Sequence, residues 1–236
     1  MKKLRAVLFD AYGTLFDVYS IALLAEQLFP GQGQRMALLW RDKQIEYTRL
    51  VTTSNHGAHY RPFWTLTEAA LRYVIKVVEP RSRTDWDEGG FEDKHRALMG
   101  QYRHLSGFPE TRAVLTALRE RGLKTGILSN GDPAMLGISV RSAGLEELLD
   151  HVISVEPIRL FKTAPEAYAQ GPAATGVPAN ETLFVSSNSW DALAATWYGY
   201  QTLWVNRHNA PFEELGTPPH HVGQSLRDVL TCLDAC

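Results

Sequence analysis

The chain has 236 residues, of which 44% are hydrophobic and 21% are charged, and its formal net charge is -2. This length is long for one domain and short for two large ones, so we expect one core with a sizeable insertion. The composition supports an ordinary buried core and excludes a disordered chain. The small negative charge predicts no nucleic-acid surface, and no apolar run reaches the roughly 18 residues that a membrane-spanning helix needs.

The amino-terminal segment begins with the basic letters MKKLR and continues into the apolar run AVLF at residues 6–9. Asp10 ends this run after a few residues, so we interpret it as a buried strand and not as a signal peptide. We therefore expect a cytoplasmic protein. The loop after Asp10 contains Gly13 and Thr14, which is typical of a corner where a strand turns into a loop.

Further along the chain, short apolar runs alternate with segments of helical periodicity. The runs lie at 125–128, 152–155, 183–186 and 202–205, and the helical segments lie at 110–121, 133–143, 165–175 and 190–198. This alternation predicts an α/β fold with a doubly wound parallel sheet that helices cover on both faces. After the last run, His220 and His221 stand in a Pro-rich stretch that we predict to be a surface loop.

The stretch from about Asp17 to Gly100 interrupts this alternation. It is helical in pattern, lacks a convincing strand and is too long to be a loop. We predict that residues 17–100 form a helical cap, inserted into a Rossmann-like core made of residues 1–16 and 101–236. A cap in this place would lie over the carboxyl ends of the strands, where open α/β sheets bind their ligands.

Polar residues follow the ends of the predicted strands, in the order Asp10, Thr14, Ser129, Asn130, Lys162, Ser186, Asn188 and Asp191. Because these strand ends converge on one crevice, the set could hold a nucleophilic carboxylate, orient a water molecule and stabilise an anion. Each residue alone also has an ordinary explanation as a helix cap, a turn former or a solvated charge. Their occurrence in order, each just past a strand, favours a shared site.

With these residues the chain resembles the haloacid dehalogenase superfamily over essentially its whole length, and it looks most like the L-2-haloacid dehalogenases. The motifs that carry the resemblance are FDAYGTLFDVYS, LWRDKQIEYTRL, GILSNGDPAML and LFVSSNSWDALAA. The resemblance implies hydrolysis of short-chain L-2-haloacids to D-2-hydroxyacids and halide, through an ester formed on Asp10. Phosphatases of the superfamily carry a second Asp two residues after the first, and an acidic pair after the fourth strand. This chain has Tyr12 and Ser187-Asn188 there, so the resemblance implies neither a metal nor another cofactor.

The resemblance also implies roles for the polar residues. Lys162 would lie beside Asp10 and keep it ionised. Thr14 would donate a hydrogen bond to Asp10. Asp191, with Ser186 and Asn188, would orient the hydrolytic water, and Ser129 and Asn130 would receive the substrate carboxylate or the halide.

Arg41 lies in the predicted cap, where a helical arginine is usually a solvated charge. The resemblance implies instead that it contacts the leaving group and the anionic substrate. The same resemblance suggests an apolar wall around the carbon–halogen bond, formed by Tyr12, Phe63, Tyr168 and Trp190. Core packing is the alternative for each of these aromatic residues.

The sequence departs from the family pattern in the cap and beside Lys162. Asp42 stands where relatives usually have Gln, and Thr163 stands where Pro is usual. The segment Thr52 to Tyr60 is slightly expanded and rich in turn formers. These departures leave the substrate range open.

Two other functions remain open on the sequence. The first is a phosphatase or phosphonatase of the same superfamily, which dependence on Mg²⁺ would favour. The second is a non-catalytic module that binds a small acid. A homodimer formed through cap helices is a further expectation, with a 2-haloalkanoic acid and halide as the small-molecule partners.

Overall fold

The computed structural model describes residues 3–79 and 88–234. Within these residues, six strands form one parallel sheet in the order β3-β2-β1-β4-β5-β6. Their bounds are β1 Ala6–Phe9, β2 Lys124–Ser129, β3 His151–Ser154, β4 Thr182–Ser186, β5 Gln201–Val205 and β6 His221–Gly223. β1 and β4 are buried along their whole length, which explains why their sequences are almost continuously apolar. The strands that the sequence predicts are confirmed.

The sixth strand contradicts one prediction. His221 does not belong to a surface loop, because it begins β6 and pairs with Leu203 of β5. His220 also contacts this edge of the sheet, since the backbone N–H of Thr202 donates to its Nδ1 at 3.2 Å. A strand of three residues is too short to show the alternating pattern by which strands are recognised in a sequence.

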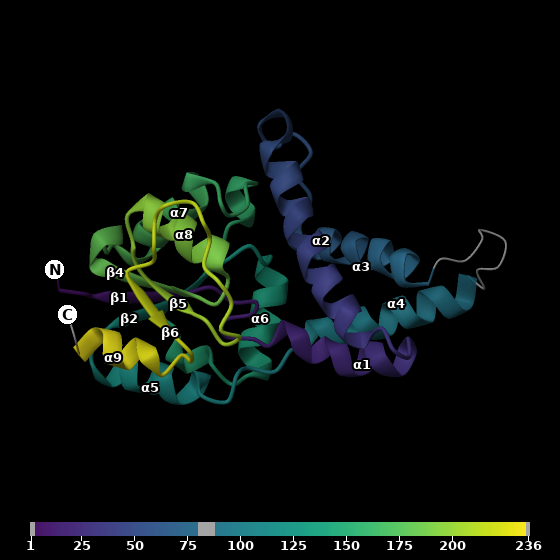
Figure 1. The fold of residues 1–236 in the computed structure, drawn as a ribbon. Helices are drawn as coiled ribbons and strands as arrows, with labels where there is room; N and C mark the ends of the chain where they lie inside the picture. The colour runs from purple at the N-terminus through teal and green to yellow at the C-terminus, as the bar shows by residue number, and fades with distance from the viewer. Residues whose placement is uncertain (1–2, 80–87, 235–236) are drawn as a thin grey trace.

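Helices cover both faces of the sheet, as Figure 1 shows. α5 (Thr111–Glu120) and α9 (Asp228–Asp234) lie on one face, and α7 (Pro165–Thr175) and α8 (Ser189–Tyr198) lie on the other. α6 (Pro133–Ser142) packs against β3 and begins with a capped turn, in which the Asp132 carboxylate accepts from the Met135 N–H at 3.0 Å. The predicted doubly wound α/β fold is therefore confirmed.

The four remaining α-helices form the separate helical part of the molecule in Figure 1: α1 Ile21–Leu28, α2 Gly33–Thr53, α3 Phe63–Val78 and α4 Glu88–Arg103. Two neighbouring connections join it to the sheet, where the Asp17 N–H donates to the Ser106 carbonyl at 2.9 Å and Phe16 pairs with Gly107. The presence of a helical cap region is confirmed. The boundaries at residues 16 and 100 stay a prediction, and α4 continues to Arg103.

Short 3-10 helices lie at Val18–Ser20, Ser54–Gly57, Glu146–Leu148, Glu156–Ile158 and Ala179–Glu181. In the described part of the chain, no helix has both the length and the apolar character needed to cross a membrane.

Candidate active site

Asp10 follows β1 at the centre of the sheet, where its N–H donates to the Val185 carbonyl at 2.9 Å. The loop then turns back at Gly13, whose φ of +91° is a conformation that favours glycine. This turn lets the Thr14 hydroxyl donate to Asp10 Oδ2 at 3.2 Å, which confirms the predicted contact. Asn188 Nδ2 donates to the same oxygen at 2.8 Å. One carboxylate oxygen is thus held by two neutral donors from different strand ends.

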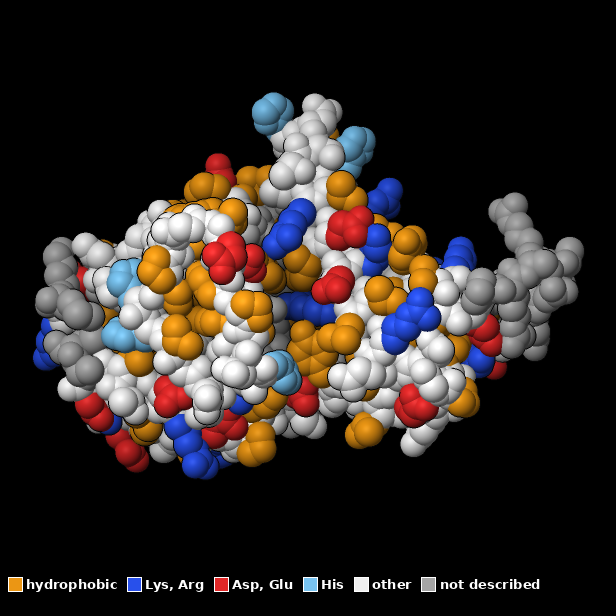
Figure 2. All heavy atoms as spheres, viewed as in Figure 1, with side chains coloured by type: hydrophobic (Ala, Val, Ile, Leu, Met, Phe, Trp, Pro, Cys, Tyr) orange, Lys and Arg blue, Asp and Glu red, His pale blue; other side chains and the backbone are white. Residues whose placement is uncertain are grey.

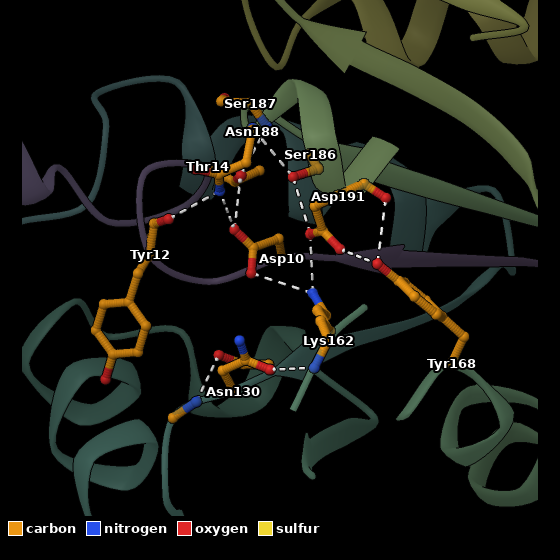
Figure 3. A network of polar contacts seen from close by, with 12 residues as sticks. Asp10, Tyr12, Thr14, Asn130, Lys162, Tyr168, Ser186, Ser187, Asn188 and Asp191 are labelled. Carbon is orange, nitrogen blue, oxygen red and sulfur yellow. Dashed lines mark hydrogen bonds and ion pairs between the residues drawn. The ribbon is translucent and has the colours of Figure 1, made fainter. Parts of the chain in front are cut away.

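Lys162 lies between two carboxylates, as Figure 3 shows. Its Nζ is 3.2 Å from Asp10 Oδ1 and 2.9 Å from Asp191 Oδ2. The side chains of Lys162, Asp10 and Asp191 are 1%, 8% and 0% exposed. Water therefore screens these charges little, and the position of the ammonium sets the charge balance around Asp10. The predicted proximity of Lys162 to Asp10 is confirmed.

Asp191 lies in the first turn of α8 and receives hydrogen bonds from further donors. The Ser186 hydroxyl donates to its Oδ2 at 3.0 Å, and the Tyr168 hydroxyl donates to its Oδ1 at 2.7 Å. Burial raises the pKa of the Asp191 carboxyl, Lys162 opposes this change, and the negative charge of Asp10 adds to it. The site thus contains a second carboxyl group whose proton affinity is higher than usual.

Tyr168 contacts Asp191 through its hydroxyl, and its role as an apolar wall residue stays a prediction. It is buried behind Asp191 and does not line the cleft described below. Burial raises the pKa of its phenol well above the usual value, and the Asp191 charge adds to this. The hydroxyl therefore stays protonated and can donate to Asp191. An aromatic ring looks like a wall residue in a sequence, whereas a buried phenol also needs a hydrogen-bond partner.

The loop after β2 holds Lys162 from its backbone side. Asn130 Oδ1 accepts from the Lys162 N–H at 2.9 Å, and Ser129 Oγ accepts from the Gly131 N–H at 3.1 Å. A side chain at Gly131 would not fit, because its Cβ would lie 2.7 Å from Cε2 of Tyr12. The peptide bond between Lys162 and Thr163 is cis. Asn130 is thus linked to Asp10 through Lys162, while Ser129 binds the backbone of the same loop.

Arg41 extends from α2 to the same network. Its Nη2 donates to the Tyr12 carbonyl at 3.1 Å and to Asn188 Oδ1 at 3.2 Å. Its Nη1 donates to Oε1 of Gln44 at 2.7 Å. Gln44 is itself buried, and its Nε2 donates to Thr67 Oγ1 at 2.6 Å. Sequence reasoning missed Gln44, although its spacing of three residues from Arg41 on one helix places the two side chains together.

Tyr12 and Phe63 belong to one aromatic stack. The Tyr12 ring lies 5.8 Å from the Phe63 ring and 5.8 Å from the Tyr102 ring, centroid to centroid. In Figure 3 the Tyr12 side chain extends away from the Asp10 carboxylate, while its carbonyl faces the network. Burial raises the pKa of the Tyr12 phenol, so it remains neutral. Tyr12 therefore places no ionised group beside Asp10.

A cleft of about 740 Å³ opens between α2 and the loops after β4 and β5. Arg41, Asn188 and Trp190 line it, and the Arg49 guanidinium lies 5.3 Å from the centre of the Trp190 ring. Asp42 is exposed and also lines the cleft. Figure 2 shows the corresponding hollow between the two parts of the molecule, with basic side chains inside it. The cleft thus reaches the site of Asp10 through Arg41 and Asn188, which line it, because Asn188 also donates to Asp10.

The residues around Asp10 do not suit a divalent cation. Hard cations need several oxygen ligands, whereas both Asp10 oxygens accept hydrogen bonds from nitrogen donors, those of Lys162 and Asn188. Within residues 3–79 and 88–234, no group of three or more His, Cys, Asp and Glu side chains is arranged to hold a metal ion. The charged groups described here are therefore those of the chain itself: Lys162 between Asp10 and Asp191, and Arg41 at Asn188.

Comparison with known proteins connects this geometry to a family. A family model described as haloacid dehalogenase-like hydrolase matches residues 4–199. Haloacetate dehalogenase H-2 of Moraxella sp. (strain B) is 40% identical over 93% of this chain and 93% of its own length. The (S)-2-haloacid dehalogenase of Pseudomonas sp. (strain YL) is 38% identical over 98% of this chain and 94% of its own length.

Solved structures give the same result. The crystal structure of one L-2-haloacid dehalogenase has 51% sequence identity and a TM-score of 0.91, and the match covers 99% of this chain and 100% of that one. The L-2-haloacid dehalogenase of Xanthobacter autotrophicus with chloropropionic acid covalently bound has 34% identity and a TM-score of 0.84, over 98% of both chains. The chain therefore belongs to the haloacid dehalogenase-like hydrolases, and within them to the L-2-haloacid dehalogenase group.

Proposed function

We propose that this protein hydrolyses short-chain (S)-2-haloacids to (R)-2-hydroxyacids, with Asp10 as the nucleophile. One observation carries the proposal: Asp10 is a buried carboxylate surrounded by donors, with a neutral aromatic residue where a phosphatase would carry its second Asp. A halide ion leaves without protonation, so this reaction needs no general acid at position 12. The relatives named as (S)-2-haloacid dehalogenases support the same reaction.

The first step is an in-line displacement at C2 of the substrate. An Asp10 oxygen forms a bond to C2 as the carbon–halogen bond breaks, and the halide leaves with the bonding electron pair. C2 is attacked once, so its configuration inverts. Thr14, Asn188 and Lys162 hold the carboxylate in one orientation, and effective molarities on the order of 10⁵–10⁸ M show how much such positioning contributes to a rate.

The second step is hydrolysis of the aspartyl ester. Water attacks the ester carbonyl carbon, releases the 2-hydroxyacid and a proton, and regenerates the Asp10 carboxylate. Asp191 is the acceptor that orients this water in the proposal, because burial raises the pKa of its carboxyl and Ser186 and Tyr168 fix its position. Lys162 balances the charges of Asp10 and Asp191 in the free enzyme, and it balances Asp191 alone while Asp10 is a neutral ester.

Arg41 supplies the positive charge for the substrate anion and the departing halide. Its guanidinium lines the cleft and already contacts Asn188, which in turn contacts Asp10. Trp190 contributes apolar surface to the same cleft. Ser129 and Asn130 are the proposed contacts for the substrate carboxylate or the halide. A homodimer stays a prediction.

The test measures halide release from each enantiomer of 2-chloropropionate in the presence of EDTA. We expect chloride from the (S)-enantiomer with the wild type and none with Asp10→Asn, while the surface variant Asp93→Asn matches the wild type. A single turnover in H₂¹⁸O should give a product whose new hydroxyl oxygen is ¹⁶O, because that oxygen comes from Asp10. ¹⁸O in the first-turnover product would overturn the ester mechanism.

A further inference from the structure

The segment that carries Lys162 is held by the helical part of the molecule as well as by the sheet. The N–H of Phe161, one residue before Lys162, donates to Oγ1 of Thr52 near the end of α2 at 3.1 Å. The next N–H along the chain, that of Lys162, donates to Asn130 after β2. The N–H groups of these two consecutive residues therefore bind different parts of the molecule: that of Phe161 binds α2, and that of Lys162 binds the loop after β2.

Aromatic contacts reinforce the attachment to the helical part. The Phe161 ring is fully buried and stacks on the Tyr60 ring, with 5.2 Å between the centroids. The Phe63 ring also lies near the Phe161 ring, with 6.1 Å between the centroids. The Arg159 guanidinium lies 5.5 Å from the centre of the Tyr60 ring. The turn from α2 to α3 thus contacts the residues that directly precede Lys162.

The attachment of the Phe161 segment affects the site because the Lys162 side chain is buried, so the position of its ammonium follows that of its backbone. The ammonium lies 3.2 Å from Asp10 and 2.9 Å from Asp191 within a buried cluster, so a small backbone displacement would change the geometry of both ion pairs. A misplacement of about 1 Å in a catalytic group can reduce a rate about a hundredfold. The segment Thr52 to Tyr60, which departs from the family pattern, is therefore placed where it can affect catalysis without contacting Asp10.

We propose that Thr52 and Tyr60 are positioning residues for Lys162, so that the docking of α2 on the sheet region controls the charge balance at Asp10. The inference rests on the proposed function, in which Asp10 is the nucleophile. Thr52 acts through the Phe161 N–H, and Tyr60 acts through the Phe161 ring. The Tyr60 hydroxyl is buried without a hydrogen-bond partner among the described residues, so its ring and not its hydroxyl makes the contact.

The test compares kcat and KM for (S)-2-chloropropionate in Thr52→Val, Thr52→Ser and the control Thr116→Val. Thr116 is also a partly buried helical threonine, and its hydroxyl donates to the Arg112 carbonyl on α5. We expect Thr52→Val to lower kcat at least fivefold with KM changed less than twofold, because the acceptor for Phe161 is lost. Thr52→Ser keeps the hydroxyl and should restore kcat to within twofold of the wild type, as should Thr116→Val.

Tyr60 provides a second, independent test. Tyr60→Phe keeps the ring and should match the wild type, whereas Tyr60→Leu should lower kcat at least fivefold. A wild-type kcat in both Thr52→Val and Tyr60→Leu would overturn this inference alone. So would an equal loss in Thr52→Ser and Thr52→Val. Absence of halide release from the wild type would overturn the proposed function, and this inference with it.

Discussion

Lys162 lies closer to Asp191 than to Asp10, at 2.9 Å against 3.2 Å, so one buried ammonium balances two buried carboxylates. Buried charges are costly unless each one is paired and hydrogen-bonded. Here Thr14 and Asn188 complete the contacts of Asp10, while Ser186 and Tyr168 complete those of Asp191. Lys162 supplies the ammonium of this cluster, so its removal should affect both folding and catalysis.

Lys162→Met should lower both the stability of the protein and its activity. Breaking a buried ion pair leaves uncompensated charge, so we expect a loss of about 3–5 kcal/mol in the free energy of unfolding. Halide release should become undetectable, because Asp10 and Asp191 would face each other without a counter-charge. Urea unfolding and the chloride assay measure the two effects. The control is Lys124→Met, an exposed lysine whose Nζ donates to the Thr175 carbonyl. Equal losses in both variants would contradict the prediction.

Tyr168→Phe should act on turnover through Asp191. The substitution keeps the ring and removes the 2.7 Å hydrogen bond to Asp191 Oδ1. A hydrogen bond to a charged group contributes about 1.5–3 kcal/mol, so kcat should fall by about tenfold to a hundredfold with little change in KM. Steady-state kinetics test this. Tyr198→Phe is the matched control, because the Tyr198 ring packs against Tyr168 in the same aromatic cluster. Similar kinetics for the two variants would count against a role for the Tyr168 hydroxyl.

Gly131→Ala should destabilise the protein for steric reasons. The new Cβ would lie 2.7 Å from the Tyr12 ring, which the rings of Phe63 and Tyr102 hold in place. Overpacking of this kind costs about 1–3 kcal/mol. Gly100→Ala on α4 is the control, since its Cβ would have no neighbour within 4 Å. That variant should gain up to about 1 kcal/mol from helix propensity. A lower Tm for Gly131→Ala and a higher Tm for Gly100→Ala would confirm both expectations. An unchanged Tm for Gly131→Ala would refute the expected steric clash.

His95 predicts a pH dependence of stability. It is only 4% exposed on α4, and burial lowers the pKa of its imidazole, with the Arg72 charge adding to the effect. Below pH 6.5 the unfolded state therefore binds more protons than the folded state, so the free energy of unfolding falls as the pH falls. Urea midpoints at pH 7.5 and 5.5 should differ more for the wild type than for His95→Gln. The exposed His59→Gln variant serves as the matched control, and a slope unchanged by His95→Gln would disprove the effect.

Much of the sheet could be predicted because buried parallel strands leave strong signals. The runs at 6–9 and 183–186 are almost continuously apolar, and both become strands that are buried on both faces. β6 left no such signal, since its three residues depend on hydrogen bonds to β5 and not on their own pattern. A strand or helix can be predicted from local sequence when its buried side chains recur with a regular period. A short strand that forms only through hydrogen bonds to its neighbour leaves no such pattern.

For the candidate site, too, some features could be predicted from the sequence and others could not. The order of Asp10, Ser129, Lys162 and Asp191 after successive strands was enough to predict that they converge, because parallel strands end at one edge of the sheet. The partner of each side chain was not predictable. Tyr168 donates to Asp191, and Gln44 holds Arg41, because of how helices pack against each other and against the sheet.

The order of the residues was enough to predict a carboxylate after the first strand, a lysine after the third, and no second Asp at position 12. The contact of Lys162 with Asp191 as well as Asp10, and that of Thr52 with the Phe161 N–H, depend on how distant segments pack and could not be predicted from the sequence. Covalent order determines which residues follow each strand, whereas charge balance in a buried cluster depends on distances of about 3 Å between groups far apart in the chain.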